Sequence, residues 1–217
     1  MSGCRRRSCG DVQVAHRLHT FIRRSVGTVF MPLSSPAPRS LRHTRAITVE
    51  AYARDDGLWD LDARIRDIKA RDIELASGTR PAGSAVHDLS LRITINTDLE
   101  IVDAEAASDS VPYPGYCDTI GPAYKKLVGL SLAKHFRLHL KDRLSGVLGC
   151  THLTELAQVL PTAAIQAFAD DAFETRSATP PGEAVRPYEI DRCHALRADG
   201  PAVAKYYPRW VIKAVQG

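Results

Sequence analysis

The sequence lacks a long hydrophobic run, which argues against a membrane-spanning helix. Hydrophobic residues make up 44% of the 217 residues, but no apolar stretch approaches the roughly 18 residues that a membrane span needs. An apolar segment typical of a secretory signal is also absent. We therefore predict a soluble, cytoplasmic protein with no membrane partner, and a chain of this length can bury a sizeable core.

Signature motifs of catalysis are missing as well. The chain has no glycine-rich loop of the phosphate or dinucleotide type, no GxSxG and no HExxH. Cysteine is scarce, and no CxxC pair occurs among Cys4, Cys9, Cys117, Cys150 and Cys193. Three widely spaced cysteines remain in the predicted domain, which favours reduced thiols over a disulfide framework. These absences leave the reaction, if there is one, open.

Acidic residues are nearly absent from residues 1–45, which hold nine arginines and one aspartate. Residues 46–217 carry 20 basic and 24 acidic residues, a net charge of −4, although the whole chain has +4. An acidic domain cannot supply the positive field that nucleic-acid binding needs, so we expect no such partner. Residues 1–40 are predicted to be a basic leader and disordered tail, and residues 41–217 one domain. The leader is either a transit peptide or basic arm, or an over-extended start that precedes Met31.

The hydrophobic pattern predicts an α+β fold. Alternating segments flank the turn at residues 55–57 and again the turn at 96–98, which predicts two hairpins in one antiparallel sheet of about four strands. The segment 73–85 between them is rich in turn residues and is expected to be a loop. A period near 3.6 then predicts three or four covering helices, over 122–128, 131–145 and 151–173, with Pro161 kinking or dividing the last. A third hairpin is expected around Asp199-Gly200.

Cys117, Cys150 and His152 are the main candidate site residues. Both cysteines precede predicted helices, where the helix dipole favours the thiolate. Thiolates and neutral imidazoles are ligands of zinc and iron. His87 and Asp88 at the head of a strand offer two further ligands. The structural alternative is that the cysteines are buried apolar residues without a ligand.

An enzymatic alternative rests on the same segments. Glu155 follows His152 by three residues and could act as a general base near a metal-bound water, although a helical glutamate also commonly faces solvent. The PYPGYC segment places Tyr113 and Tyr116 beside Cys117, which could line a pocket. This predicts a cofactor-free enzyme for a small, aromatic metabolite, with Cys117 or His152 in proton transfer. A non-catalytic binding or regulatory domain is the third alternative.

Two histidines on one helix offer a weaker metal site. His135 and His139 lie four residues apart, a spacing that can chelate a metal ion. Their neighbours are lysines and arginines, which favours a solvated basic face instead.

Several long motifs carry a family resemblance. They are LRHTRAITVEAYARDDGLWDLDARI, RPAGSAVHDLSLRITI, IVDAEAASDSVPYPGYC, GVLGCTHLTELAQVLPTAAIQAF and DRCHALRADGPAV. On these motifs, over about residues 41–210, the chain resembles the bacterial family of domain of unknown function 2889 (DUF2889). That resemblance implies no established activity.

A second resemblance is to the scaffold proteins of iron–sulfur cluster assembly. It rests on the order of Asp88, Cys117, residues 128–132 and the Cys150/His152 pair. The first cysteine of the scaffold pattern falls on Val86 here, and its adjacent His-Cys pair is replaced by Cys-x-His. The resemblance implies metal ligation by Cys117, Cys150, His152 and Asp88, with Cys193 supplying a missing ligand if the last hairpin folds back. We therefore predict an α+β domain that binds zinc or iron at these residues.

Overall fold

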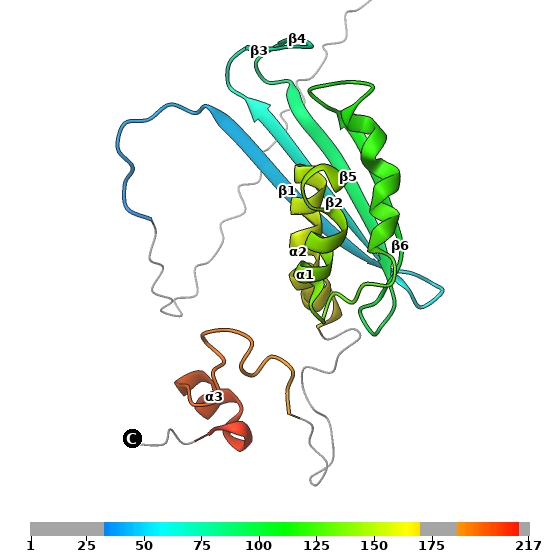
Figure 1. Ribbon diagram of the computed structural model, residues 1–217. Helices are drawn as coiled ribbons and strands as arrows, with labels where there is room; N and C mark the ends of the chain where they lie inside the picture. The colour runs from blue at the N-terminus through cyan, green and yellow to red at the C-terminus, as the bar shows by residue number, and fades with distance from the viewer. Residues whose placement is uncertain (1–32, 170–185, 213–217) are drawn as a thin grey trace, which may run out of the picture. The chain divides into compact units, whose positions relative to one another are not determined.

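The computed structural model describes residues 33–169 and 186–212 (Figure 1). The chain divides between Arg39 and Ser40 into two units. The sheet, the helices and the candidate site all lie in the second unit.

A four-stranded antiparallel sheet in the order β1-β2-β5-β6 forms the centre of the fold (Figure 1). Its strands are β1 (His43–Ala53), β2 (Trp59–Lys69), β5 (Ala85–Ile95) and β6 (Ile101–Ser110). Gly57 adopts the left-handed conformation (φ 80°) that lets the first hairpin turn tightly. The two predicted hairpins and the α+β class are confirmed.

The segment between the two hairpins was expected to be a loop, but it contains a small hairpin of β3 (Ile73–Leu75) and β4 (Gly78–Arg80). Strands of three residues are too short to show an alternating pattern, so turn residues dominate this stretch of sequence. Nη2 of Arg80 donates a hydrogen bond of 2.6 Å to the carbonyl oxygen of Val111. This bond ties the small hairpin to the chain just after β6.

Helix α2 (Thr151–Phe168) covers one face of β1, β2 and β5, which we call the inner face (Figure 1). The helix is continuous through Pro161, so the chain does not divide there. Its predicted apolar side is fully buried: Leu153, Leu156, Leu160, Ala164 and Phe168. Within the two described ranges, no helix has the length and apolar character needed to cross a membrane.

The shorter helices complete the cover of the inner face. They are the 3-10 helix η1 (Cys117–Leu127), α1 (Phe136–Leu144) and the 3-10 turn η2 (Gly146–Leu148). The helix predicted to begin at Ser131 begins five residues later, because residues 129–132 pair with the chain around the start of β6. Backbone hydrogen bonds join Leu132 N–H to the Leu99 carbonyl (2.8 Å) and Ile101 N–H to the Leu130 carbonyl (2.9 Å).

The core lies between the inner face of the sheet and these helices. Every second residue of β2 and β5 is buried there: Leu61, Ala63, Ile65, Leu89, Leu91, Ile93 and Ile95. The same alternation, continued toward one end of the sheet, reaches Asp67 in β2 and His87 in β5. Two polar residues therefore occupy positions that an apolar pattern would fill.

The C-terminal segment 186–212 forms helix α3 (Pro201–Tyr206) and the 3-10 turn η3 (Pro208–Trp210). The third hairpin predicted here is wrong for these residues, which contain no strand. Pro201 occupies the first turn of α3, where a fixed φ and a missing N–H favour helix initiation. Asp199-Gly200 was predicted to be a hairpin turn, whereas Gly200 is the N-cap of this helix.

Candidate functional site

Polar side chains line up across three strands at one end of the inner face. Arg45 of β1 lies opposite Asp67 of β2, and Asp67 lies opposite His87 of β5. Side chains opposite each other on antiparallel strands have Cβ atoms about 5 Å apart. The strand register alone therefore brings a guanidinium, a carboxylate and an imidazole into contact.

Asp67 is the buried centre of this group, with 3% of its surface exposed. Its Oδ1 accepts hydrogen bonds of 2.8 Å from Nε of Arg45 and from Nε2 of His43, and its Oδ2 accepts one of 2.8 Å from Nη2 of Arg45. Burial by itself raises the pKa of Asp67, but these hydrogen bonds outweigh it and hold the pKa well below its usual range. The carboxyl group is therefore ionised at neutral pH.

Glu155 of α2 is linked to this carboxylate through Arg45. The other terminal nitrogen of Arg45 lies 2.5 Å from Oε2 of Glu155. The hydrogen bond to Asp67 is the largest influence on Arg45 and raises its pKa, so the guanidinium stays charged. Asp67 and Glu155 together carry two negative charges and Arg45 one positive charge. When the histidines around Asp67 are neutral, the group formed by them with Asp67, Glu155 and Arg45 has a net charge of −1.

His152, in the first turn of α2, meets His87 and Asp67 from the helix side. The two imidazole rings stack with centroids 3.7 Å apart and planes tilted by 32°. Oδ2 of Asp67 lies 3.1 Å from Nδ1 of His87 and 3.6 Å from Nε2 of His152. Burial, reinforced by the nearby imidazole of His152, lowers the pKa of His87 and favours its neutral form.

Cys150 contacts the other side of the His152 ring. Its Sγ lies 4.0 Å from Nδ1 of His152, whereas Nε2 of the same ring faces Asp67. Burial raises the pKa of the Cys150 thiol, but the contact with His152 and the nearby backbone N–H groups of His152 and Leu153 lower it overall. A thiolate here would accept a hydrogen bond from Nδ1–H of a neutral His152, which leaves the Nε2 lone pair directed at the carboxylate.

Two residues fix the start of α2 and therefore the position of His152. A Cβ on Gly149 would stand 2.4 Å from the carbonyl oxygen of Leu144, so only glycine allows this close approach. The buried hydroxyl of Tyr124 accepts a hydrogen bond of 3.1 Å from the Cys150 N–H and lies 2.9 Å from the Cys150 carbonyl oxygen. The Tyr124 ring belongs to η1, which thereby anchors the helix start.

A pocket of about 410 Å³ opens beside the two imidazoles. The three main residues of the sequence prediction, Cys117, Cys150 and His152, all line it. The other lining residues are His87, Leu89, Val111, Pro112, Tyr113, Tyr116, Thr119, Ile120, Gly149 and Thr151. The PYPGYC segment and the start of α2 therefore border the same pocket.

Four of the five predicted ligands, Asp88, Cys193, Cys117 and Cys150, lie outside the group of Asp67, His87 and His152. Asp88 follows His87 in β5 and so points to the opposite face of the sheet, where its carboxylate lies 2.6 Å from Arg64 and 3.1 Å from Arg66. Cys193 is exposed in the segment 186–212 and is not a member of the group around Asp67. Cys117 lines the pocket but also lies outside that group. The predicted general base Glu155 is engaged with Arg45.

Asp67 was not predicted as a site residue, and His87 was predicted only as a further possible ligand at the head of a strand, together with Asp88. A signal for both was present in the strand periodicity. Counting in steps of two from Leu61 reaches Asp67, and counting back from Leu89 reaches His87. A charged residue on the buried face of a strand needs a partner, so such a residue is a candidate member of a polar site.

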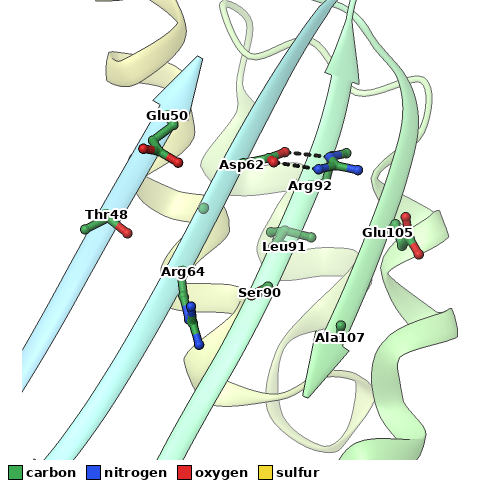
Figure 2. A pocket seen from close by; sticks show the side chains of 10 residues that line it. Thr48, Glu50, Asp62, Arg64, Ser90, Leu91, Arg92, Glu105 and Ala107 are labelled. Carbon is green, nitrogen blue, oxygen red and sulfur yellow. Dashed lines mark hydrogen bonds and ion pairs between the residues drawn. The ribbon is translucent and has the colours of Figure 1, made fainter. Parts of the chain in front are cut away.

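A second hollow of about 500 Å³ lies on the outer face of the sheet, which the helices leave uncovered (Figure 2). Charged residues from neighbouring strands surround it, and the carboxylate of Asp62 accepts two hydrogen bonds of 2.6 Å from Arg92. Glu50, Arg64 and Glu105 lie around this pair (Figure 2). Among the described residues, no histidine or cysteine lines the hollow, so it lacks the imidazole and thiolate ligands that zinc and softer metals prefer.

The geometry around Asp67 suits a metal ion. Within residues 33–169 and 186–212, Asp67, His87 and His152 offer three donor atoms that lie within 4.8 Å of one another. Donor atoms around a tetrahedral ion with bonds of 2.0–2.1 Å lie about 3.3–3.4 Å apart. The distances from Asp67 Oδ2 to the two imidazole nitrogens, 3.1 and 3.6 Å, bracket this value.

Comparison with known proteins finds one match. A family model described as "Protein of unknown function (DUF2889)" matches residues 43–166. The matched range includes every residue of the group around Asp67 and ends before the segment 186–212. No curated protein and no solved structure matches the chain, so the resemblance to iron–sulfur scaffold proteins stays a prediction.

Proposed function

The chain belongs to the DUF2889 family, and we propose that its α+β domain binds a divalent metal ion, zinc or iron, through Asp67, His87 and His152. One observation carries the proposal: a carboxylate and two imidazoles from β2, β5 and α2 meet within 4.8 Å beside an open pocket. Two histidines and one carboxylate form a donor set that suits both zinc and non-haem iron.

The hydrogen-bonding pattern favours a cation between His152 and Asp67. When Nδ1–H of His152 donates a hydrogen bond to Cys150, Nε2 carries a lone pair that faces the carboxylate oxygen at 3.6 Å. Two acceptors repel each other at this distance unless a proton or a metal ion lies between them. The net charge of −1 on Asp67, Arg45 and Glu155 also favours a positive ion.

The surroundings of the three donors support an open site instead of a closed structural one. Structural zinc sites have four protein ligands, whereas catalytic sites have three and leave a position for water or substrate. His87 and His152 line the pocket. Arg45 and His43 donate hydrogen bonds to the Asp67 carboxylate. An ion here would polarise an oxygen atom of a molecule bound in the pocket.

Elemental analysis of the purified protein tests the proposal. We expect about one zinc or iron ion per chain in the wild type, and near-complete loss in His87→Ala and His152→Ala because each removes one of three donors. His139→Ala is the matched control, since His139 is exposed on α1 and lies outside the group. Cys150→Ala should retain most of the metal.

Circular dichroism of each variant would show whether the fold is intact. Metal retained in a folded His152→Ala variant would contradict the proposal. So would a wild-type protein that stays metal-free after incubation with Zn²⁺ or, without oxygen, with Fe²⁺.

Metal-free acid–base catalysis is a second candidate. It is favoured by the order of Cys150, His152 and Asp67, in which a thiol and a carboxylate flank opposite nitrogens of one imidazole. Such an order is typical of activated cysteine nucleophiles. The elemental analysis separates the two candidates, because only the first requires a stoichiometric metal ion.

A further inference from the structure

We infer that the pocket beside Asp67, His87 and His152 binds a small aromatic molecule that carries one anionic oxygen donor, a carboxylate or a phenolate. The inference rests on the proposed metal site and adds the class of ligand. The pocket has a volume of about 410 Å³, which falls within the range of pockets that bind small molecules. The lining, the two tyrosines and the charge of the group each support it.

The lining excludes highly charged ligands. Within residues 33–169 and 186–212, no lysine, arginine, aspartate or glutamate lines this pocket, and Leu89, Val111 and Ile120 supply an apolar wall. A phosphate group or a polyanion would find no lysine or arginine among these residues to replace its lost hydration. The outer hollow differs in this respect, because Arg64, Arg92 and three acidic residues surround it (Figure 2).

Two tyrosine rings from the turn after β6 provide aromatic surface. Tyr113 is 47% exposed and Tyr116 is 81% exposed, although both line the pocket. Exposed aromatic rings beside an apolar hollow can stack on a planar ligand. Such rings gain little from an aliphatic acid of the same charge.

The turn that carries these rings is held in place from two sides. The Tyr113 carbonyl accepts backbone hydrogen bonds from Cys117 (3.0 Å) and Tyr116 (3.2 Å). From the small hairpin, Ser77 donates to the Pro112 carbonyl and Arg80 to the Val111 carbonyl. The wall is therefore largely formed before a ligand binds, which reduces the entropy cost of binding.

The charge of the group makes binding depend on the metal ion. Without a metal ion, Asp67, Arg45 and Glu155 together carry −1 and repel an anionic oxygen. A divalent ion changes this charge to +1 and offers an open coordination position. The oxygen of the ligand should therefore point toward the two imidazoles, and its ring toward the tyrosines.

Isothermal titration calorimetry with benzoate and phenol tests the inference, with acetate and inorganic phosphate as controls. In zinc-loaded protein we expect benzoate or phenol to bind at least about tenfold more tightly than acetate, and phosphate to bind no better than acetate. Tyr116→Ala should weaken aromatic binding roughly two- to tenfold without changing the metal content. Tyr206→Ala, an exposed tyrosine of α3, is the matched control.

The outcomes separate this inference from the metal proposal. Zinc-loaded protein that binds acetate or phosphate as tightly as benzoate and phenol would overturn the aromatic ligand and leave the metal site standing. A second outcome would sustain the aromatic pocket and overturn the metal site. In it, the protein binds no ion when metal is added, and it binds the aromatic ligand equally tightly with and without the added metal. Comparing benzoate with phenol shows whether a carboxylate or a phenolate is preferred.

Discussion

Two buried aspartates on neighbouring strands, Asp67 and Asp88, have different surroundings on opposite faces of the sheet. Their side chains are 4% and 8% exposed, and both contact arginine. Asp88 meets two arginines, Arg64 and Arg66, each about half exposed on the uncovered outer face. Asp67 meets one arginine and three histidines, and α2 covers it.

The difference lies in the partners and not in the burial. Guanidinium groups that reach solvent can satisfy a carboxylate without any further role, and Asp88 is explained completely in this way. Imidazoles add lone pairs and exchangeable protons, and two of those around Asp67 also line a pocket. A buried carboxylate therefore indicates a functional site when its partners include imidazoles that line a pocket.

Replacing each aspartate by alanine should give the largest contrast. Asp67→Ala removes a ligand and leaves the Arg45 charge without its main partner, so we expect loss of the metal ion and a fall of about 2–3 kcal/mol in unfolding free energy. Asp88→Ala should cost less, because Arg64 and Arg66 can turn to solvent, and its metal content should stay normal. Urea denaturation and elemental analysis measure both effects.

Added metal sharpens the same comparison. Zinc at about 100 times its dissociation constant should stabilise the metal-free wild type and metal-free Asp88→Ala by about 2.7 kcal/mol, because the ion binds only the folded protein. Asp67→Ala should gain nothing. Equal stabilisation of both variants would show that zinc binds elsewhere.

Tyr124→Phe should have the next largest effect. It leaves the buried Cys150 N–H without its acceptor and loosens the start of α2, so we expect roughly a tenfold loss of metal affinity. Tyr116→Phe changes an exposed hydroxyl and serves as control. An unchanged zinc dissociation constant in Tyr124→Phe would show that the hydroxyl does not position His152.

Glu155→Gln should have a smaller effect. It removes the negative charge that offsets Arg45 and keeps the side-chain shape, so metal affinity should fall a few-fold because the group becomes neutral overall. Competition with a chelator measures the change. The opposite sign, a tighter zinc complex, would contradict the charge argument.

Arg92→Gln on the outer face should have the smallest effect. It breaks the pair with Asp62, but both side chains reach solvent, and such pairs contribute little to stability. Metal content and aromatic binding should match the wild type. A loss of either would mean that the outer face supports the site.

Periodicity predicted most of the fold. The alternation in β2 and β5 and the apolar side of α2 require a sheet with one covered face, because each pattern buries its residues only in that arrangement. Short or irregular elements escaped prediction for the same reason: β3, β4 and α3 have too few residues for a period. Ser131 was mistaken for a helix cap because its pairing with the chain near β6 is non-local.

The candidate site was predicted only in part. The position of Cys150 and His152 at the start of a predicted helix identified these two residues, and the PYPGYC motif identified a pocket wall. Asp67 was missed, and His87 was not connected with it, because a sequence does not state which residues of two strands lie opposite each other. The predicted Asp88 lies one position too far along β5, and a shift of one residue places a side chain on the other face.

The sequence by itself determined the secondary-structure pattern, the acidic charge of the domain and the family, because each depends on composition or on local order. Only the tertiary structure decided which residues form the site. Asp67, His87 and His152 are separated by 20 and 65 positions, and their meeting depends on strand register and on where α2 begins. Those two features result from packing across the whole domain, which no local pattern encodes.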